Sequence, residues 1–485
     1  WFHFLQNSCF PRDCHEFCQP APLTGNDTSS FSGPSLHFHQ PRNLEYLMAI
    51  NVHISTLAYL VFSFLNLSAH VLDDFQTIRR VAGLSAREDQ NYWITSYEGA
   101  NPLSVELSNP HDCGTDVYGC VYIVDKESHS VLRVSADGSS ITTAAGTHHS
   151  GNGGDVEILA TSVPLNNPNG LHVLADGTFY ILDTGNQKIR RVSSSGYCTT
   201  ILSYPNGFGA GRGLWVSEDE QVIYFCGEFV AGGNQNVIRF IQGKSPTVFA
   251  SIPAGSHGLG NIDVAPDQSL GITSAGGNRV YRVRGPGATP QIIAGNGSAA
   301  GEPLDGTPAL LASLDRVRGI AFLPDGSYFL ATQKGGDVWW INLSGNIYRF
   351  VTGAGSGNAT VRDQVSRTSA GDKLAEPRAI HLASNGDLLI VSNDNGVIQA
   401  VNTTRRPEPA QLEVERGEEG LFYLKFRGSY QGQYIFESSE SLLPTSWQNE
   451  GIFTTAAPTT QRVPFLPHLS GKYWRLRVPT QAGGQ

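Results

Sequence analysis

The sequence predicts an all-β fold: a six-bladed β-propeller closed by an N-terminal strand and followed by a small β-sandwich. Three observations carry this prediction. The 485 residues include 54 glycines and 26 prolines at a hydrophobic content of 40%, which is typical of a turn-rich β protein. The stretch LNNPNGLHVLADGTFYILDTGNQKIRRV at 165–192 returns several times along the chain. Each return contains short apolar segments bounded by Gly, Asn and Asp, which are strand and turn signals.

A hairpin recurs six times in this pattern. Its first arm occurs at 120–125, 178–183, 222–227, 270–275, 327–332 and 387–392. Its second arm follows a short polar turn and occurs at 130–135, 188–193, 237–242, 279–284, 337–342 and 397–402. Both arms are rich in β-branched and aromatic residues, which favours strands over helices.

Each hairpin is flanked by further strands. Preceding strands are clear at 170–175, 213–218, 319–324 and 379–384, and following strands at 141–146, 198–203, 247–252, 291–296 and 347–352. The unit is therefore a four-stranded antiparallel meander. One such sheet cannot bury both of its faces alone, but six sheets packed around an axis can, which is the propeller arrangement.

The ends of the repeat region predict how the ring closes. The sixth unit ends without a fourth strand, whereas TIRRVAG at 77–83 has no hairpin partner and is similar to the fourth strands. We expect this N-terminal strand to complete the sixth blade of a propeller over 75–403. A proline-containing linker at 404–411 then leads to a predicted β-sandwich at 412–480, which contains LFYLKF, QYIFES and YWRLRV.

The stretch GNGGDVEILATSVPLNNPNGLHVLADGTFYILDTGNQKIRRV at 151–192 resembles the NHL repeat of bacterial secreted proteins. The resemblance extends over roughly 75–403 and implies a six-bladed propeller. Family members include interaction scaffolds and a few enzymes, so the resemblance leaves the function open. YIFESSESLLPTSW followed by YWRLRV is similar to an Ig- or fibronectin-like module, which implies a spacer or surface-association role.

The N-terminal part predicts export. Met48 is the only methionine, and the apolar run that follows it at 57–67 has the length of a signal-peptide core and is too short to span a membrane. We predict a signal peptide at 48–69 and a secreted, periplasmic or cell-surface protein with no stable membrane insertion after cleavage. A buried helix or strand is the alternative. Residues 1–47 show no periodicity and are predicted to be a non-native or disordered extension.

Charge and cysteine content limit the partners and the crosslinks. A formal net charge of −10 gives no reason to expect nucleic acid as a partner. Four cysteines follow the predicted cleavage site, and Cys113 and Cys120 flank the turn-like stretch DCGTDVYGC. An exported protein can form disulfides, so these two residues are a candidate pair.

Aligning the repeats on PNG at 168–170 predicts a ligand site at the mouth of the central channel, where the innermost strands begin. The residues at this position or beside it are His111, Asn169, Arg212, Asn261, Arg318 and Arg378. Guanidinium groups bind carboxylates, phosphates and sulfates bidentately, so a positive mouth on an acidic protein favours anions. The alternative is that the arginines only pair with neighbouring groups such as Asp112 or Asp263.

These observations favour a non-enzymatic binding or scaffold protein that recognises an anionic carbohydrate or an acidic protein segment and needs no cofactor. The sequence contains no G-x-S-x-G, H-E-x-x-H or phosphate-loop motif, and we predict no catalytic residue. The long connections at 84–108, 147–166, 297–315 and 353–376 are expected to gather on the mouth face.

The competing prediction is a metal-dependent hydrolase or lyase at the same mouth, lactonase-like with calcium or amidating-lyase-like with zinc. Three arginines would repel a cation, and Asp112 and Asp263 are the weak candidates for metal ligands. His172 and His381 follow their aligned positions by the same two residues, so we expect them to occupy a recurring packing position.

Overall fold

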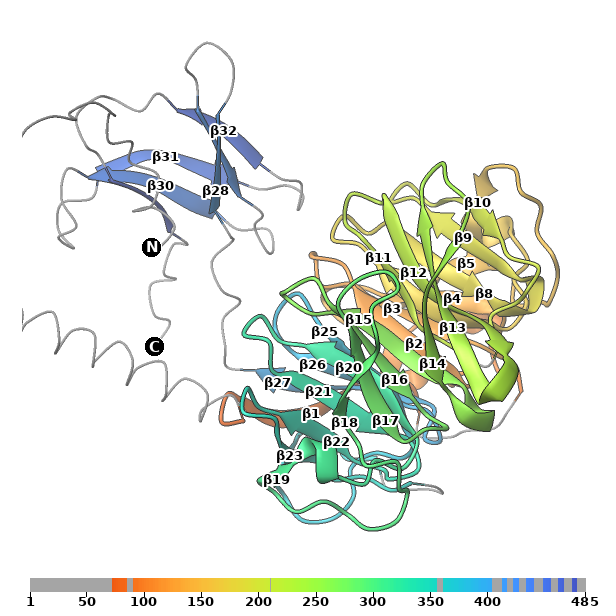
Figure 1. Cartoon of the computed structure of the whole chain (residues 1–485). Helices are drawn as coiled ribbons and strands as arrows, with labels where there is room; N and C mark the ends of the chain where they lie inside the picture. The colour runs from red at the N-terminus through yellow and green to blue at the C-terminus, as the bar shows by residue number, and fades with distance from the viewer. Residues whose placement is uncertain are drawn as a thin grey trace, which may run out of the picture. The chain divides into compact units, whose positions relative to one another are not determined.

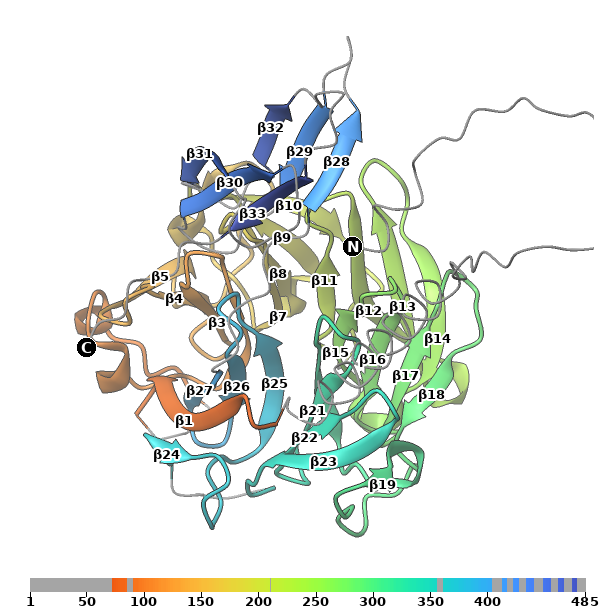
Figure 2. The same cartoon turned by 90° about the vertical axis from the view of Figure 1, so that its left-hand side faces the viewer.

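The computed structural model describes residues 72–84, 90–209, 211–355 and 361–403, together with the backbone of six strands between 412 and 477. Six antiparallel sheets follow one another around an axis, as Figures 1 and 2 show. Their innermost strands contact each other in a closed circle, because the last packs against the first. The predicted six-bladed β-propeller is therefore confirmed.

Each blade is named here by its order in the chain, with strands given from the axis outward. The first contains β2 (Pro110–Thr115), β3 (Val121–Asp125), β4 (Ser130–Val134) and β5 (Ile141–Gly146). The second contains β7 (Pro168–Val173), β8 (Phe179–Asp183), β9 (Lys188–Val192), β10 (Tyr197–Ser203) and β6 (Ile158–Leu159). The third contains β11 (Leu214–Val216), β12 (Val222–Val230), β13 (Asn234–Ile241) and β14 (Thr247–Pro253).

The fourth blade contains β15 (Leu259–Val264), β16 (Leu270–Ser274), β17 (Arg279–Val283) and β18 (Gln291–Ala294). The fifth contains β20 (Val317–Phe322), β21 (Tyr328–Thr332), β22 (Val338–Ile341), β23 (Asn346–Val351) and β19 (Thr307–Pro308). The sixth contains β25 (Pro377–Leu382), β26 (Leu388–Ser392), β27 (Val397–Thr403), β1 (Phe75–Ala82) and β24 (Val365–Ser366). Short 3-10 turns lie at 95–97, 102–104, 160–162, 184–186, 231–233, 255–257 and 309–311.

The hydrophobic core lies between the blades. The described residues form six apolar clusters, and each combines side chains from two neighbouring blades. Between the fifth and sixth blades, for example, Phe329 and Phe350 pack in one cluster with Ile390. Every sheet therefore depends on both of its neighbours for the burial of its two faces, as expected of a repeat architecture.

The predicted closure by the N-terminal strand is confirmed. β1 pairs antiparallel with β27, placing Ile78 opposite Val401, and Figure 2 shows β1 beside β27 and β24. The buried Arg367 holds the start of β1, since its Nε donates to the Phe75 carbonyl at 2.7 Å and its Nη1 donates to the Phe350 carbonyl at 3.1 Å. This arginine ties the first strand to the fifth blade as well as to the sixth.

The long connections do not gather only on the mouth face, and this expectation is corrected. Parts of three connections form β6, β19 and β24, which add to the outer edges of the second, fifth and sixth blades. A fourth exchanges backbone hydrogen bonds with Ile141 at the edge of the first blade. These segments satisfy N–H and C=O groups that an exposed edge strand would leave unpaired.

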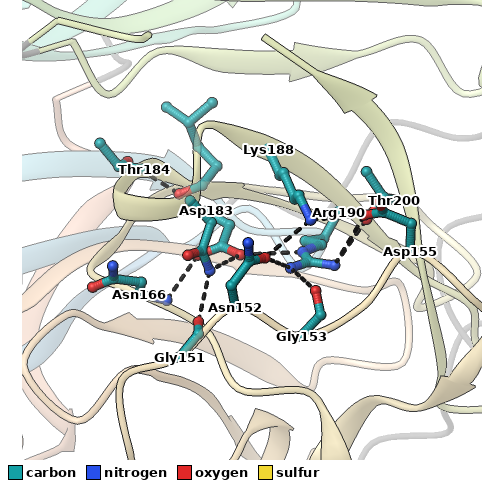
Figure 3. A network of polar contacts seen from close by, with 12 residues as sticks. Gly151, Asn152, Gly153, Asp155, Asn166, Asp183, Thr184, Lys188, Arg190 and Thr200 are labelled. Carbon is teal, nitrogen blue, oxygen red and sulfur yellow. Dashed lines mark hydrogen bonds and ion pairs between the residues drawn. The ribbon is translucent and has the colours of Figure 1, made fainter. Parts of the chain in front are cut away.

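In the second blade, side chains of the repeat signature donate hydrogen bonds to the backbone of the connection that precedes the blade (Figure 3). The fully buried Arg190 donates its Nε to Asp183 Oδ2 at 3.1 Å. Its Nη2 donates to the Gly153 carbonyl at 2.8 Å, and its Nη1 donates to the Gly154 carbonyl at 2.7 Å. Asn186 Nδ2 bridges Asp183 Oδ2 and the Gly151 carbonyl, each at 2.8 Å. The glycine-rich segment is therefore held to the blade.

Neighbouring blades are joined near the axis by polar side chains. The backbone N–H of Thr115 in the first blade donates to His381 Nε2 in the sixth at 3.3 Å. The backbone N–H of Phe322 in the fifth blade donates to Asp263 Oδ2 in the fourth at 2.7 Å. His172 lies against Trp215 of the next blade, with ring centroids 5.8 Å apart. The two histidines thus occupy packing positions between blades, as their equivalent spacing predicts.

The candidate disulfide between Cys113 and Cys120 is not formed, and both residues are free thiols. The strand register places Cys113 opposite Ile123. Cys113 packs in the cluster between the sixth and first blades, whereas Cys120 packs in the cluster between the first and second blades. The two thiols face cores on opposite sides of one sheet, so the turn between them does not bring them together.

The C-terminal strands form two three-stranded antiparallel sheets. One contains β28 (Leu412–Arg416), β29 (Phe422–Phe426) and β32 (Gln461–Phe465), and the other contains β31 (Gln448–Thr454), β30 (Gln433–Ser439) and β33 (Tyr473–Arg477). The predicted extension at 1–47, signal peptide at 48–69 and linker at 404–411 lie outside the described residues. Within the part of the chain that the structure describes, no helix has the length and apolar character needed to span a bilayer.

We expect Arg190→Ala to lower the free energy of unfolding by about 3–5 kcal/mol, because it leaves the buried Asp183 carboxylate without its cation. Scanning calorimetry would show this as a lower Tm. The matched control is Arg191→Ala on the same strand. Arg191 is only partly buried and pairs with Glu220, so its loss is expected to cost about 1 kcal/mol or less. Equal shifts for the two variants would contradict a stabilising role of the buried Arg190–Asp183 pair.

A second prediction concerns pH. Burial lowers the pKa of His381 from 6.5 to about 4, so between these values only the unfolded chain takes up the proton. The stability that depends on neutral His381 is therefore complete above pH 6.5 and is lost as the pH falls toward 4, by at most roughly 3 kcal/mol. His381→Asn keeps a hydrogen-bond acceptor but does not titrate. We expect its Tm to fall less than that of the parent between pH 7 and pH 4.5.

The control for this experiment is His149→Asn, since His149 is exposed. It should retain the acid sensitivity of the parent. A His381→Asn variant that loses as much Tm on acidification as the parent would show that this histidine does not contribute to the pH dependence.

Candidate functional site

The predicted mouth residues come from equivalent places in the fold. Five lie in the first half of innermost strands, and Arg212 lies two residues before β11. All therefore occupy the same end of the axis. Two innermost strands begin two residues earlier than predicted, at Pro168 and Pro377. Proline is tolerated as the first residue of a strand, so these prolines do not interrupt the sheet.

One part of the site runs through the third, second, first and sixth blades. Arg212 Nε donates to Asn169 Oδ1 at 3.1 Å, and the same oxygen contacts His111 Nδ1. Arg378 Nη1 lies 2.9 Å from His111 Nε2. With an oxygen acceptor at Nδ1 and a guanidinium donor at Nε2, the His111 imidazole is neutral and carries its proton on Nδ1. Burial, Arg212 and Arg378 all lower the pKa of His111.

A second part continues into the fifth blade. Arg378 Nη2 donates to Glu376 Oε2 at 3.0 Å, and Gln333 Nε2 donates to the same oxygen at 2.9 Å. Gln333 Oε1 accepts from Arg318 Nε, and Lys334 Nζ contacts Glu376 Oε1. These contacts form one continuous network from five blades. We call it the polar ring: Arg212, Asn169, His111, Arg378, Glu376, Gln333 and Arg318.

Asp112 and Asn261 meet across the axis, since they belong to the first and fourth of six blades. Asn261 Nδ2 donates to Asp112 Oδ1 at 3.3 Å. The backbone N–H of Cys113 donates to Asp112 Oδ1 at 3.0 Å, and that of Leu171 donates to Oδ2 at 3.1 Å. Burial raises the pKa of Asp112 to about 7 despite these hydrogen bonds. The two side chains therefore bridge the axis at this level.

The polar ring has more positive than negative charge. Arg212 and Arg318 are 7% and 8% exposed, and in the part of the chain that the structure describes neither has a carboxylate within ion-pair distance. Burial is the main cause that lowers the pKa of Arg318 to about 9, followed by repulsion from Arg378. Burial and the other two arginines lower the pKa of Arg212. A buried guanidinium without a counter-charge is costly.

Three buried polar atoms of this site have no hydrogen-bond partner within the described ranges: Arg212 Nη1, Arg378 Nε and Asn261 Oδ1. Two of them are donors and the third is an acceptor. Buried polar groups are normally satisfied, so the hydrogen bonding of the site is incomplete among the described residues.

The arginines bond to neighbouring carbonyl and carboxylate oxygens, as the alternative interpretation expects in kind. Their partners are Asn169, Gln333 and Glu376, and not the two aspartates that it named as examples. Asp263 instead accepts the backbone N–H groups of Val264 at 2.8 Å and Phe322 at 2.7 Å. Burial raises the pKa of Asp263 to about 6. This aspartate joins two blades and is not part of the polar ring.

The donor set does not suit a hard divalent cation. Such ions need several carboxylate or carbonyl oxygens, but both oxygens of Asp112 and of Asp263 already accept backbone N–H groups. Among the described residues, no group of three or more His, Cys, Asp and Glu side chains is placed to hold a metal. The charge of Arg212, which acts on Asp112, further opposes a cation.

The sequence alignment missed three residues of the site: Glu376, Gln333 and Lys334. Gln333 and Lys334 lie in the turn after β21, and Glu376 directly precedes β25. No distinguishing signal was present, because the equivalent turn positions of the other repeats vary in kind, from Lys126–Glu127 in the first to Asn393–Asp394 in the sixth. Turns between the second and third strands lie on the same face as the starts of the first strands, which brings them to the mouth.

No protein-family model matches the chain, and no curated protein matches it either. Among solved structures, a structural genomics protein of unknown function from Bacteroides thetaiotaomicron VPI-5482 is similar over 67% of this chain and 75% of its own, at 17% identity and a TM-score of 0.51. An auxiliary nutrient binding protein from the same strain is similar over 68% and 77% respectively, at 14% identity and a TM-score of 0.48. A gluconolactonase from Xanthomonas campestris is similar over 68% and 89%, at 13% identity and a TM-score of 0.42.

The first of these similarities shows the fold alone, because its identity of 17% is low. The other two have TM-scores of 0.48 and 0.42 and carry no argument about this chain. The function must therefore be argued from the site itself.

Proposed function

We propose that this protein is an exported, non-enzymatic binding module that takes an anionic group of its ligand into the polar ring. The observation that carries the proposal is the pair of buried guanidinium groups, Arg212 and Arg318, that have no carboxylate partner among the described residues. An anion would supply the missing negative charge. Bidentate guanidinium contacts to carboxylate, phosphate or sulfate are the strongest available in such a site.

An anionic carbohydrate suits the site better than an acidic protein segment. The unpartnered donors Arg212 Nη1 and Arg378 Nε suit a carboxylate, whereas the unpartnered acceptor Asn261 Oδ1 needs a hydroxyl or amine donor. A sugar acid carries a carboxylate and hydroxyl groups side by side. The carboxylate of an acidic side chain offers only acceptors.

The repeat type, the location of the protein and the role of the C-terminal module are part of the same proposal. We propose that the repeats are of the NHL type, since the Asp183–Asn186–Arg190 network gives the signature residues a structural role. We also propose that the chain acts at the cell surface, in the periplasm or as a secreted protein, with the C-terminal Ig-like module as a spacer or surface-association domain.

The test measures thermal stabilisation of the full chain by oligogalacturonate, a polyaspartate peptide and a neutral cello-oligosaccharide. We expect oligogalacturonate to raise the Tm of the parent, because a ligand that binds only the folded state stabilises it by about 3 kcal/mol at a hundredfold excess over Kd. The Tm rise should be lost in an Arg212→Gln, Arg318→Gln, Arg378→Gln variant.

The matched control changes Arg282, which pairs with Asp267 on a solvent-exposed part of the fourth blade. Arg282→Gln should bind like the parent. An equal Tm rise in the triple variant would overturn the proposal, and a response to polyaspartate alone would assign the site to an acidic protein segment.

The competing function, a metal-dependent hydrolase or lyase at the same mouth, is tested by metal content. We expect the dialysed full chain to retain well below one equivalent of calcium or zinc in elemental mass spectrometry, because the carboxylate oxygens at the mouth are already occupied. About one bound equivalent that disappears in an Asp112→Asn variant would favour the enzyme instead.

A further inference from the structure

A cavity of about 370 Å³ opens on the side of the propeller, away from the polar ring. It lies between the second and third blades. Residues that end or follow β10 line one side, and residues of β12, β13 and the start of β14 line the other. Its volume is that of a pocket for a small ligand or a single side chain. None of its lining residues belongs to the polar ring.

The walls of this cavity combine apolar and polar side chains in about equal number. Leu202 and Ile238 contribute apolar surface together with Val248, which is 55% exposed. Pro205 and Pro246 add two rigid rings at the rim. Such walls suit the methylene stem of a long side chain, which can lie against apolar surface while its charged end reaches a polar partner.

A single acidic residue, Glu228, lies in the lining. Its Oε2 accepts a hydrogen bond from Tyr204 Oη at 2.6 Å, and its Oε1 accepts one from Asn236 Nδ2 at 2.8 Å. Burial raises the pKa of this carboxyl group, but hydrogen bonds from Tyr204, from its own backbone N–H and from Asn236 together outweigh burial and hold the pKa below its ordinary value. The carboxylate is thus ionised at neutral pH and fixed in orientation.

The Glu228 carboxylate has no cationic partner. The cavity lining contains no lysine or arginine, and none of the ion pairs within the described ranges involves Glu228. The carboxylate accepts hydrogen bonds from Tyr204, Asn236 and its own backbone N–H, and its two oxygens offer about four lone-pair positions in all. An oriented, ionised carboxylate beside the aliphatic side chains of Leu202, Ile238 and Val248 is complementary to an ammonium group on an aliphatic stem.

We propose that this cavity binds an alkylammonium group, namely a lysine side chain of a partner protein, independently of the anionic ligand at the polar ring. The ammonium group contacts Glu228, and the four methylene groups lie along Leu202, Ile238 and Val248. Tyr204 and Asn236 hold the carboxylate in place and do not contact the stem.

The probes for the experiment are Nα-acetyl-lysine methylamide and, as the neutral control, Nα-acetyl-norleucine methylamide, which has an aliphatic stem without the ammonium group. Methyl NMR on the full chain follows the resonances of Ile238 and Val248. We expect saturable shifts with the lysine probe and at least about tenfold weaker binding of the norleucine probe, because only the former makes the charge-assisted contact.

Two variants and a control make the test decisive. Glu228→Gln keeps the shape and should weaken the lysine probe about tenfold. Val248→Lys, at an exposed position, places an ammonium group at the cavity from within the chain and should block the probe without disturbing the fold. Glu157→Gln, at an exposed acidic residue elsewhere, should bind like the parent.

Equal binding of the two probes, unchanged binding by Glu228→Gln, or lysine-dependent shifts confined to methyl groups outside the cavity would each overturn the proposal. If Glu228→Gln does not fold, the result with Val248→Lys decides the question. A negative result for the lysine probe would not count against anion binding at the polar ring, because the two sites share no residue.

Discussion

The pairing of β1 with β27 is the contact on which the propeller depends. The two strands are about as far apart in the sequence as the domain is long, with a hydrogen bond between Arg79 and Asn402 that spans 323 positions. Bringing such distant segments together carries a loop-closure cost, although this cost grows only slowly with length. The stabilisation gained by closing the ring is large, because all six apolar clusters of the described residues lie between blades. An open ring would leave two blade faces in water, whereas the closed ring leaves none of them unpaired.

Tight packing at the axis links this constraint to the site. A Cβ added to Gly170 would lie 2.3 Å from the backbone oxygen of Arg212, and one added to Gly260 would lie 2.3 Å from that of Arg318. The glycine of one blade thus makes room for the backbone that carries the arginine of the next. The fold therefore sets the spacing of the guanidinium groups, and their partners Asn169, Gln333 and Glu376 set their directions.

The sequence predicts the part of this arrangement that is local and repeated. Strand and turn signals recur six times in the same order, although the length of the repeat varies, and the unpaired strand at 77–83 predicts ring closure correctly. Alignment of the repeats also predicts that the six residues from His111 to Arg378 share one end of the axis, and the structure places them there. It misses Glu376 and Gln333, because their place at the mouth depends on how a turn of one blade meets a strand of the next. It misplaces the long connections for a related reason, since edge strands such as β6 form through pairing with a distant strand.

The hydrogen bond between Asp112 and Asn261 has a consequence for the movement of solutes. The two side chains meet at 3.3 Å across the axis. A solute that moves along the axis at this level has to break that hydrogen bond first. The pair is therefore a polar barrier between the two ends of the propeller, and its strength sets a lower limit to the cost of passage.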